Sequence, residues 1–600
     1  MPHISPDGLR DDYDVIVVGS GAAGGQTAYT LTMEGARVLM LEAGRNYVPE
    51  TETPMFNTPD QAPLRGRSTD DKEFGFYDAT VDGGWQMPGE PYTNASDTAE
   101  SKFWWWRARM LGGRTNHWGR ISLRNGPYDF KPRSRDGLGF DWPIDYADLA
   151  PWYDKVEMLI GVYGDNNNLE NTPDSPAGCL LPPPAARVGE RLIAQEAGKL
   201  GVPVIPIHRA VLTRALDADR LPALLHPGNT RAQRILAADM RARAVCFWAT
   251  PCGRGCSIRA TYQSTTVHLP PALATGNLDL LTNAMVREVL LGGDGRARGV
   301  EFIDARNGEM HRVSARVVVL AASACETVRL LLNSKSPAFP QGLANSSGKV
   351  GRYLMDTVGA SLSGQIPSLE DLPLHNEDGA GGSHVYSPWW LYPEQRAGRL
   401  DFARGYHIEM GSGRQMPGTG TLGTLDELAG PGYGAGYRES MRRYYGSLVG
   451  FAGRGEMIPN DHSYCEIDPE VKDRFGIPVL RFHWRWSEHE TRQAAHMQRT
   501  FADIIAAMGG RVLGTVQSDG ARAIEPGGYI IHEVGGTIMG MDPADSVTSS
   551  YGQTWDVPNL FVTDGALFPS NADKNPTLTI MALAWRAADH ILGALRRRDI

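Results

Sequence analysis

The most constraining feature of the sequence is a glycine-rich turn close to its start. An apolar run from Val15 to Val18 leads into Gly19-Ser-Gly21-Ala-Ala-Gly24, and a second apolar run ends at Glu42. This order of strand, glycines, helix, strand and acid is typical of a βαβ dinucleotide-binding unit. We expect Gly19 to form the tight turn, Gly21 to let the backbone approach a pyrophosphate, and Gly24 to bring helix and strand together. Glu42 would then accept hydrogen bonds from ribose hydroxyls.

Length and composition indicate a globular protein with more than one core. The chain has 600 residues, of which 42% are hydrophobic and 21% are charged. Its formal net charge of −10 disfavours binding along nucleic acid phosphates, which requires a basic face. We therefore expect a small neutral or polar substrate and no nucleic acid partner.

The sequence shows neither a membrane span nor a secretory signal. It contains no run of eighteen apolar residues, the length that predicts a transmembrane helix. Its first residues lack a basic segment followed by a separate apolar segment, which a secretory signal requires. A cytoplasmic location is the default prediction, and a periplasmic one follows only if a signal-bearing partner exports the chain.

Two later segments favour FAD over NAD as the dinucleotide. Residues Ala315 to Ser334 read as an apolar strand, small residues and a helix, and Asn559 to Ser570 read as a strand ending in Asp564-Gly565. Both would return to the sheet of the glycine turn, with Asp564 near a ribityl or phosphate group. Two ordinary core strands are the alternative interpretation.

Taken together, several motifs resemble the glucose-methanol-choline (GMC) oxidoreductases, flavoproteins that oxidise alcohols and sugars. They keep the family's order along nearly the whole chain: the glycine turn with Glu42, Arg109 to Gly119, Val319 to Ser334, Gly348 to Asp356, His532 to Gly540, and Asn559 to Ile591. The last two are similar to the pyranose oxidase, gluconate dehydrogenase and glucoside 3-dehydrogenase branches, in which the sequence NPTLT opens the final helix. This similarity implies a sugar or glycoside substrate.

The resemblance implies a mixed α/β fold, in which a Rossmann-like FAD-binding domain is interleaved with a substrate domain built on an antiparallel β-sheet. We expect the FAD domain to comprise residues 10–50, 101–135, 250–356 and 525–600. The substrate domain would comprise residues 51–100, 136–249 and 357–524. In the substrate domain, the runs Pro478 to Phe482 and Ser387 to Pro393 suggest a sheet above the flavin. Residues 360–440 read as irregular, with a loop or lid at 411–436.

His532 and Asn575 match the family's catalytic pair. The predicted reaction oxidises a secondary hydroxyl, with carbon 3 of a glycoside as the best candidate, by hydride transfer to flavin N5. A neutral imidazole can accept the hydroxyl proton near pH 7, so His532 would be the general base, and Asn575 would hold the hydroxyl. Asn575 is also the predicted N-cap of the last helix, with Pro576 at its first position. A helix start does not explain the neighbouring Lys574, which indicates a ligand nearby.

Other positions match the family's flavin contacts. The start of the last helix would face the pyrimidine edge of the flavin and stabilise its reduced form through the positive end of the helix dipole. His117 is either a covalent tether to the flavin or a non-covalent contact, and Val286 is a backbone contact on the adenine side. The complete predicted set is Gly19, Gly21, Ala22, Ala23, Gly24, Glu42, Ala43, Arg109, Gly113, Asn116, His117, Trp118, Gly119, Val286, Ala321, Ala322, Asp564, Gly565, Asn575, Pro576 and Thr577.

A cysteine cluster, Cys246, Cys252 and Cys256, leaves several interpretations open. The thiolates could hold an iron–sulfur cluster, Cys252 and Cys256 could form a disulfide in an oxidising compartment, or all could be reduced thiols in a loop. A zinc site lacks a fourth ligand, because the nearest histidine is His268. The sequence favours the reduced loop or the disulfide over an iron–sulfur cluster and predicts no metal site.

Two function classes remain. The first is a sugar or glycoside dehydrogenase or oxidase that passes electrons to oxygen, a quinone or a cytochrome, with a small partner subunit as an option. An oxygen-using oxidase of pyranose sugars belongs to this class. The second is a flavoprotein with structural FAD and no alcohol oxidation. His532 and Asn575 favour the first.

Overall fold

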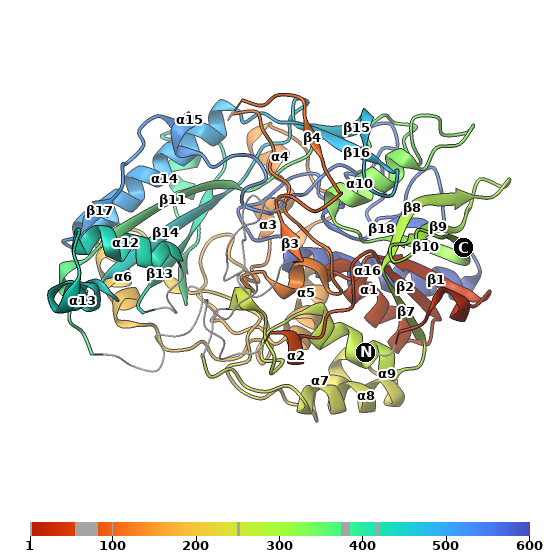
Figure 1. Ribbon diagram of the computed structural model, residues 1–600, viewed down its shortest axis with the longest axis horizontal. Helices are drawn as coiled ribbons and strands as arrows, with labels where there is room; N and C mark the ends of the chain where they lie inside the picture. The colour runs from red at the N-terminus through yellow and green to blue at the C-terminus, as the bar shows by residue number, and fades with distance from the viewer. Residues whose placement is uncertain (1–2, 54–81, 99, 249–251, 374–383, 415–418) are drawn as a thin grey trace.

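The computed structural model describes residues 3–53, 82–98, 100–248, 252–373, 384–414 and 419–600. Its largest elements are a seven-stranded sheet and a six-stranded sheet, which lie toward opposite sides of the molecule in Figure 1 with helices packed around them. This arrangement confirms the mixed α/β fold expected from the sequence. The domain boundaries stay a prediction.

The seven-stranded sheet contains the glycine turn. Its strands follow the order β7 (Leu278–Thr282), β2 (Val38–Glu42), β1 (Tyr13–Val18), β10 (Met310–Leu320), β9 (Ala297–Asp304) and β8 (Ala284–Leu291), with β18 (Leu560–Val562) beside β10. The run from β7 to β10 and the β18 pairing are parallel, whereas β10, β9 and β8 are antiparallel. Because β1 and β2 are almost wholly buried, their sequences are continuous apolar runs rather than alternating ones, apart from Asp14 near the start of β1 and Glu42 at the end of β2.

Helices α1 (Ala22–Met33) and α16 (Thr577–Arg597) pack against each other beside this sheet. Tyr29 of α1 meets Trp585 of α16 edge-on, with ring centroids 5.8 Å apart. By length and composition α16 could cross a membrane, but 78% of its most apolar window is buried inside the protein. Core packing therefore accounts for its apolar sequence.

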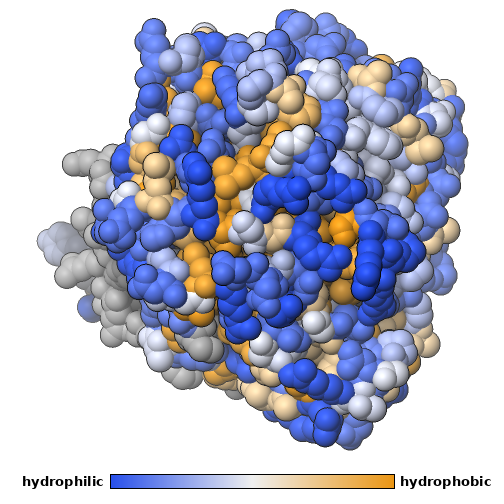
Figure 2. Space-filling model, turned by 90° about the vertical axis from the view of Figure 1, so that its right-hand side faces the viewer, coloured by the Kyte–Doolittle hydropathy of each residue, from blue (hydrophilic) through white to orange (hydrophobic). Residues whose placement is uncertain are grey.

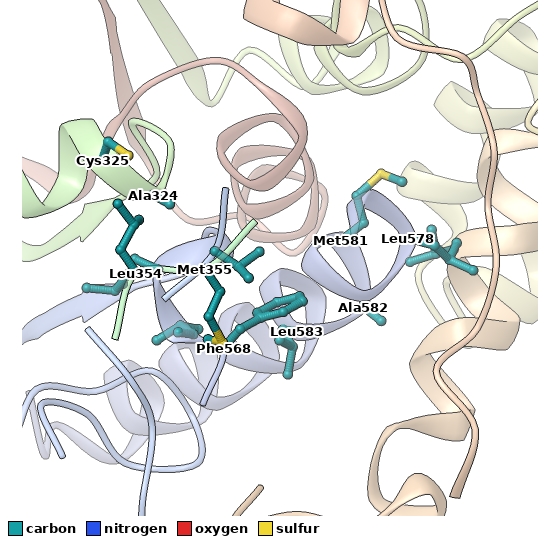
Figure 3. Close-up of a cluster of buried hydrophobic side chains, with 14 of the residues drawn as sticks. Ala324, Cys325, Leu354, Met355, Phe568, Leu578, Met581, Ala582 and Leu583 are labelled. Atoms are coloured by element: carbon teal, nitrogen blue, oxygen red, sulfur yellow. The ribbon is translucent and has the colours of Figure 1, made fainter. Parts of the chain in front are cut away.

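A buried apolar cluster fixes the start of α16, as Figure 3 shows. It combines residues of α16, of α10 (Ala324–Asn333) and of two loops: Ala324, Cys325, Leu354, Met355, Phe568, Leu578, Met581, Ala582 and Leu583. Burial of each large side chain contributes about 1.5–3 kcal/mol relative to exposure. The first turn of α16 is therefore held in one position, which matters because that turn reaches the candidate site.

The six-stranded sheet is entirely antiparallel. Its order is β17 (Arg511–Leu513), β11 (Val358–Gln365), β14 (Leu448–Gly455), β13 (Tyr406–Ser412), β12 (Val385–Ser387) and β6 (Ile205–Pro206). Helix α14 (Glu488–Ala507) packs on it and begins with a capping box made by Ser487 and Glu490. A Cβ at Gly453 would lie 2.4 Å from the Met497 sulfur, so this glycine lets the helix approach the sheet.

Three interpretations of the substrate region were wrong. The run from Pro478 to Phe482 is a strand, β16 (Pro478–His483), but it pairs with β15 (Tyr464–Lys472) and β4 (Thr93–Asn94) in a separate sheet. The expected loop at 411–436 contains α12 (Thr419–Ala429) and the start of α13 (Gly434–Tyr444), because frequent glycine concealed a helical pattern; residues 415–418 lie outside the described residues.

The aromatic run from Ser387 to Pro393 also differs from the expectation of a surface above the flavin. Trp389 is buried, and its ring lies 4.9 Å from that of Tyr406. Neither residue lines the cavity that the glycine turn shares with the start of α16. The run therefore packs in the core of the six-stranded sheet, and the described residues between 360 and 440 are more regular than their composition suggests.

The other helices and strands lie outside the two large sheets, and the longest of them, α5 (Tyr146–Ile160), packs against α16. They are α2 (Pro49–Glu52), α3 (Pro127–Phe130), α4 (Pro132–Asp136), α5 (Tyr146–Ile160), α6 (Val188–Lys199), α7 (Leu221–Leu225), α8 (Thr230–Arg241), α9 (Leu269–Ala274), α11 (Tyr392–Arg396), α13 as above, α15 (Gly520–Ala523), β3 (Gly83–Gly84) and β5 (Arg107–Ala108). The face in Figure 2, at the side of the seven-stranded sheet, is mainly hydrophilic, with apolar side chains in small patches.

Candidate active site

A cavity of about 400 Å³ is lined by the glycine turn, the start of α16 and two strands of the six-stranded sheet. Segments far apart in the sequence therefore meet at one site. The predicted residues that line it are Gly19, Gly21, Ala22, Glu42, Ala43, Arg109, Gly113, His117, Trp118, Gly119, Val286, Ala321, Ala322, His532, Gly565, Asn575, Pro576 and Thr577.

Predicted cofactor contacts that do not line the cavity are Ala23, Gly24, Asn116 and Asp564. The Asp564 carboxylate accepts backbone hydrogen bonds from Ser323 at 3.1 Å and Ala566 at 2.9 Å, and its burial raises the pKa to about 6. Asn116 is buried and donates to the Leu111 carbonyl at 2.9 Å. Asp564 and Asn116 therefore hold neighbouring backbone segments of the cavity wall together. The sequence motifs alone do not show whether a residue has this structural role or contacts a ligand.

The glycine turn combines close packing with one open position. Gly19 has φ +99°, in the region that favours glycine, and a Cβ there would lie 2.4 Å from the Ala321 carbonyl oxygen. A Cβ at Gly24 would lie 1.9 Å from the Gly19 carbonyl oxygen, whereas a Cβ at Gly21 would meet nothing within 4 Å. Protein packing thus requires Gly19 and Gly24, and the space at Gly21 opens to the cavity.

Glu42 lies at the end of β2 with its carboxylate held at the cavity wall. It accepts the Gly44 backbone N–H at 2.8 Å and the Ser20 backbone N–H at 3.2 Å, and the Ser20 hydroxyl also donates to it. Burial raises the pKa of Glu42, while these hydrogen bonds act to lower it. The lone pairs left on this fixed carboxylate suit a sugar hydroxyl.

A strained loop places His532 at the opposite end of the cavity. Ile531 adopts φ +65°, which is unusual for a β-branched residue. The Asp356 carboxylate stabilises this loop by accepting the backbone N–H of His532 at 2.9 Å and of Ile530 at 3.3 Å. His532 Nδ1 lies 3.1 Å from the Thr357 hydroxyl, which fixes the ring from its far side.

His532 is the neutral imidazole that general-base chemistry requires. Burial lowers its pKa to about 3, with a smaller contribution from the Arg454 guanidinium. For the adjacent Asp356, burial and the nearby Glu533 carboxylate raise the pKa to about 7. The histidine is therefore unprotonated at neutral pH and can accept a proton.

Asn575 faces His532, but it does not cap the helix. Helix α16 begins at Thr577 with Pro576 as its N-cap, one residue later than the sequence predicted, and no side chain caps it. The Asn575 amide instead lies with Nδ2 3.4 Å from His532 Nε2 and 3.2 Å from Glu409 Oε1. The Asn575 side chain therefore points into the site, where it has two polar partners, and not toward the first turn of the helix.

The sequence analysis missed two charged residues beside this pair, Glu409 of β13 and Arg454 of β14. Both line the cavity, and Glu409 Oε2 lies 3.5 Å from Arg454 Nη2. Burial acts to raise the pKa of Glu409, but Arg454 and a hydrogen bond with His407 outweigh it and hold the pKa below its usual range. Their strands carry no local motif, so only the sheet register reveals them.

Ion pairs within the protein account for Lys574, which does not line the cavity, and the expectation of a ligand nearby stays a prediction. The Lys574 ammonium lies 3.0 Å from Asp129 Oδ2 and 2.5 Å from Asp573 Oδ1. These two carboxylates and Glu456 are buried and could otherwise hold a cation, since one oxygen of each lies within 4.8 Å of the others. The lysine already supplies that positive charge and joins the α16 loop to α3.

The cysteine cluster and His117 lie near each other. Cys252 and Cys256 are buried, Cys246 is partly buried, and none of them forms a disulfide. His117 lines the cavity and donates from Nδ1 to the Gly253 carbonyl at 3.3 Å. Neither an iron–sulfur cluster nor a covalent flavin link is shown by this arrangement.

Comparison with known proteins places this site in a family. A family model described as GMC oxidoreductase matches residues 231–358 with its N-terminal part and 459–584 with its C-terminal part. The chain is 31% identical to 2-methyl-1,2-propanediol dehydrogenase of Mycolicibacterium austroafricanum over 587 residues, which cover 97% of this chain and 95% of that protein. The chain belongs to the GMC oxidoreductase family.

Other relatives of this GMC oxidoreductase differ in their named substrates. The fructose dehydrogenase large subunit of Gluconobacter japonicus is 28% identical over 593 residues, covering 97% of this chain and 98% of that protein. The crystal structure of pyridoxine 4-oxidase from Mesorbium loti superposes with a TM-score of 0.60 at 18% identity, covering 96% and 99% of the two chains. That structural likeness shows the fold, and the relatives leave the branch of the family unresolved.

Proposed function

We propose that this GMC oxidoreductase uses FAD to oxidise a secondary hydroxyl of a sugar or glycoside. The observation that carries the proposal is the pairing of His532 Nε2 with Asn575 Nδ2, 3.4 Å apart, in the cavity that also contains the dinucleotide-type turn. The family acts on alcohol groups. A sugar is supported by the resemblance of the final helix to sugar-oxidising branches and by the similarity to a fructose dehydrogenase subunit.

The cavity residues fit FAD. The start of α1 and the open space at Gly21 suit a pyrophosphate, because backbone N–H groups and the helix dipole favour an anion there. The Glu42 carboxylate suits the adenosine ribose. The other end of the cavity meets the start of α16, where the dipole favours negative charge. When bound, FAD supplies the hydride acceptor for the oxidation.

The chain's own groups would handle the proton and the oxygen. His532 takes the hydroxyl proton at Nε2 because its ring is neutral, while Thr357 holds Nδ1 on the far side. The Asn575 amide donates from Nδ2 to the substrate oxygen as the carbonyl forms. His532 would thus act as the base and Asn575 as the hydrogen-bond donor.

Carbon 3 of a glycoside is the specific position that the resemblance to glucoside 3-dehydrogenases favours. The electrons would leave to oxygen, a quinone or a cytochrome, and a small partner subunit is an option because one relative is named a large subunit. An oxygen-using pyranose oxidase is the runner-up. A protein with structural FAD alone is disfavoured by the neutral His532 facing Asn575.

The test is anaerobic reduction of the bound flavin. The purified protein is mixed in turn with glucose, a β-glucoside, gluconate and a non-sugar alcohol, and the flavin band near ~450 nm is followed. Bleaching by a glycoside, with the 3-keto product identified by mass spectrometry and NMR, supports the proposal. A yellow protein that no alcohol or sugar bleaches contradicts it. Oxygen added after bleaching separates an oxidase from a dehydrogenase.

The same sample decides how the cofactor is held. If His117 is a tether, acid-precipitated protein stays yellow; if it is a non-covalent contact, the flavin stays in the supernatant. Either result leaves the alcohol chemistry unchanged.

A further inference from the structure

We infer that the Glu409–Arg454 pair selects substrates with a second hydroxyl on the carbon next to the one that is oxidised. This inference rests on the proposed alcohol oxidation and names its substrate class as vicinal diols and polyols, in preference to simple alcohols. It concerns residues that take no part in the proton transfer itself.

The Glu409–Arg454 pair contacts the catalytic residues through Asn575. Strands β13 and β14 are neighbours, with His407 opposite Arg454 and Glu409 opposite Ala452 in the register. Glu409 Oε1 lies 3.2 Å from Asn575 Nδ2, which itself lies 3.4 Å from His532 Nε2. A hydroxyl held between Nδ2 and Nε2 is therefore close to the carboxylate, and both charged groups line the cavity.

The ionised Glu409 fixes the direction of the Asn575 amide. A carboxylate only accepts hydrogen bonds, so the amide nitrogen and not its oxygen must face it. One N–H of Nδ2 goes to Glu409, and the other faces His532 Nε2 at 3.4 Å, where a substrate oxygen can accept it instead. Within the described part of the chain, Asn575 Oδ1 has no hydrogen-bond partner, so the amide is held through its nitrogen alone.

The two charged groups keep hydrogen-bonding capacity for a ligand. The closest Glu409–Arg454 approach is 3.5 Å, which is long for a hydrogen bond, so this is an ion pair with unfilled donor and acceptor directions. Arg454 uses Nη1 on the Gly453 carbonyl at 3.0 Å. The side chains are 13% and 19% exposed, toward the cavity that they line.

A hydroxyl is the group that satisfies both partners together, since it can donate to the carboxylate and accept from the guanidinium. The two oxygens of a gauche vicinal diol lie about one hydrogen-bond length apart, ~2.8 Å. That spacing matches the step from the Asn575 amide to Glu409. Because Arg454 balances the charge of Glu409, the pair favours a neutral hydroxyl over an ammonium or a carboxylate.

A substrate without the second hydroxyl would cover both charges and give them no hydrogen bond. Sites built to bind a hydroxyl discriminate strongly against analogues that lack it, because the protein groups are left unpaired. The relatives named for 2-methyl-1,2-propanediol and for fructose both act on molecules with adjacent hydroxyls.

The experiment compares 2-methyl-2,3-butanediol with 3-methyl-2-butanol, which share one secondary hydroxyl and differ only in the neighbouring tertiary hydroxyl. Anaerobic flavin reduction in the holoenzyme gives kcat/KM for each, and we expect the diol to be favoured by about 100-fold or more. In Glu409→Gln and Arg454→Met this ratio should fall at least tenfold. The ratio separates recognition from positioning, because any disturbance of Asn575 slows both substrates alike. Glu196→Gln, which changes a buried acid paired with Lys199 outside the cavity, should keep the wild-type ratio.

A binding measurement is independent of turnover. Pinacol is a vicinal diol without a transferable hydride, and 2,3-dimethyl-2-butanol is the same skeleton with one hydroxyl. Perturbation of the flavin band should give a smaller Kd for pinacol in the wild type, and equal values in Glu409→Gln.

Equal kcat/KM values for the matched alcohols, equal affinities for the two tertiary alcohols, or an unchanged ratio in both variants would each overturn the inference and leave alcohol oxidation standing. If no alcohol or sugar reduces the flavin, the proposed function falls, while the pinacol titration still decides whether the pair binds a diol.

Discussion

Two glutamates from different sheets line the same cavity, and they differ in where their hydrogen-bond and ion-pair partners come from. Glu42 ends a buried strand, and its partners Ser20 and Gly44 belong to the same βαβ unit. Glu409 lies in the middle of β13, and its partners Asn575, His407 and Arg454 come from a helix start and from two neighbouring strands. The contacts of Glu42 form within one short stretch of sequence, so they can be predicted from it. The contacts of Glu409 exist only after the sheet and α16 have come together.

Their electrostatics differ in the same way. Burial raises the pKa of Glu42, because the hydrogen bonds from Ser20 and Gly44 and the charge of Arg109 do not fully offset it. Glu409 is also buried, but the neighbouring cation Arg454 and the hydrogen bond with His407 hold its pKa low. The cation beside Glu409 therefore outweighs burial, whereas the one near Glu42 does not.

The largest effect is expected from His532→Ala in the substrate region. Removal of a general base should lower the rate of flavin reduction about 100- to 10,000-fold, with FAD content unchanged. The exposed His462→Ala is the control and should reduce its flavin at the wild-type rate. Stopped-flow reduction under anaerobic conditions measures both. A variant that retains FAD and loses less than tenfold in rate would show that another group accepts the proton.

A matched pair of glycines tests the nucleotide region. Gly24→Ala should destabilise the protein by about 1–3 kcal/mol, because its Cβ would meet the Gly19 carbonyl. Gly21→Ala meets no protein atom, so the apoprotein should unfold at the wild-type urea concentration while FAD binds at least about tenfold more weakly. Urea unfolding of the apoprotein and titration with FAD measure the two effects. Unchanged FAD affinity in Gly21→Ala would mean that the open space does not receive the cofactor.

The two glutamates should separate in a crossed experiment. Glu42→Gln removes the negative charge at the ribose position and should weaken FAD binding about tenfold, equivalent to ~1.4 kcal/mol. Glu409→Gln should bind FAD with the wild-type Kd. Fluorescence titration of the apoproteins provides both values. Similar losses of FAD affinity in both variants would contradict the assignment of Glu42 to the nucleotide region and Glu409 to the substrate region.

The smallest effect concerns the pH dependence of stability through Asp356. Its folded pKa, about 7, exceeds the ordinary value of about 3.9, so its contribution to stability is fully present below about pH 4 and is lost as the pH rises through about 7. The stability advantage of wild type over Asp356→Asn should therefore shrink from acid to neutral pH. Urea unfolding of the holoproteins at both pH values measures it, with the exposed Asp461→Asn as control. If the stability advantage of wild type over Asp356→Asn grew with pH, the raised pKa assigned to Asp356 would be wrong.

Much of the nucleotide region could be predicted from the sequence. The strand, the glycines and Glu42 act within one local unit, so their order and spacing carry the geometry. Predictions failed where the position of a side chain is set by residues far away in the sequence. Asn575 was expected to cap α16 and instead faces His532 and Glu409, and the ion pair of Lys574 with Asp129, which lies far away in the sequence, was not predicted.

The sequence by itself determined the α/β class, the dinucleotide-type turn and the pairing of His532 with Asn575, because those features depend on short motifs or on a family resemblance. Only the tertiary structure decided which charges stand beside the pair. Glu409 and Arg454 reach the cavity through the register of two antiparallel strands, and a one-residue slip would turn both to the opposite face. No local pattern encodes that register, since the pairing of the whole sheet and its packing against α14 set it.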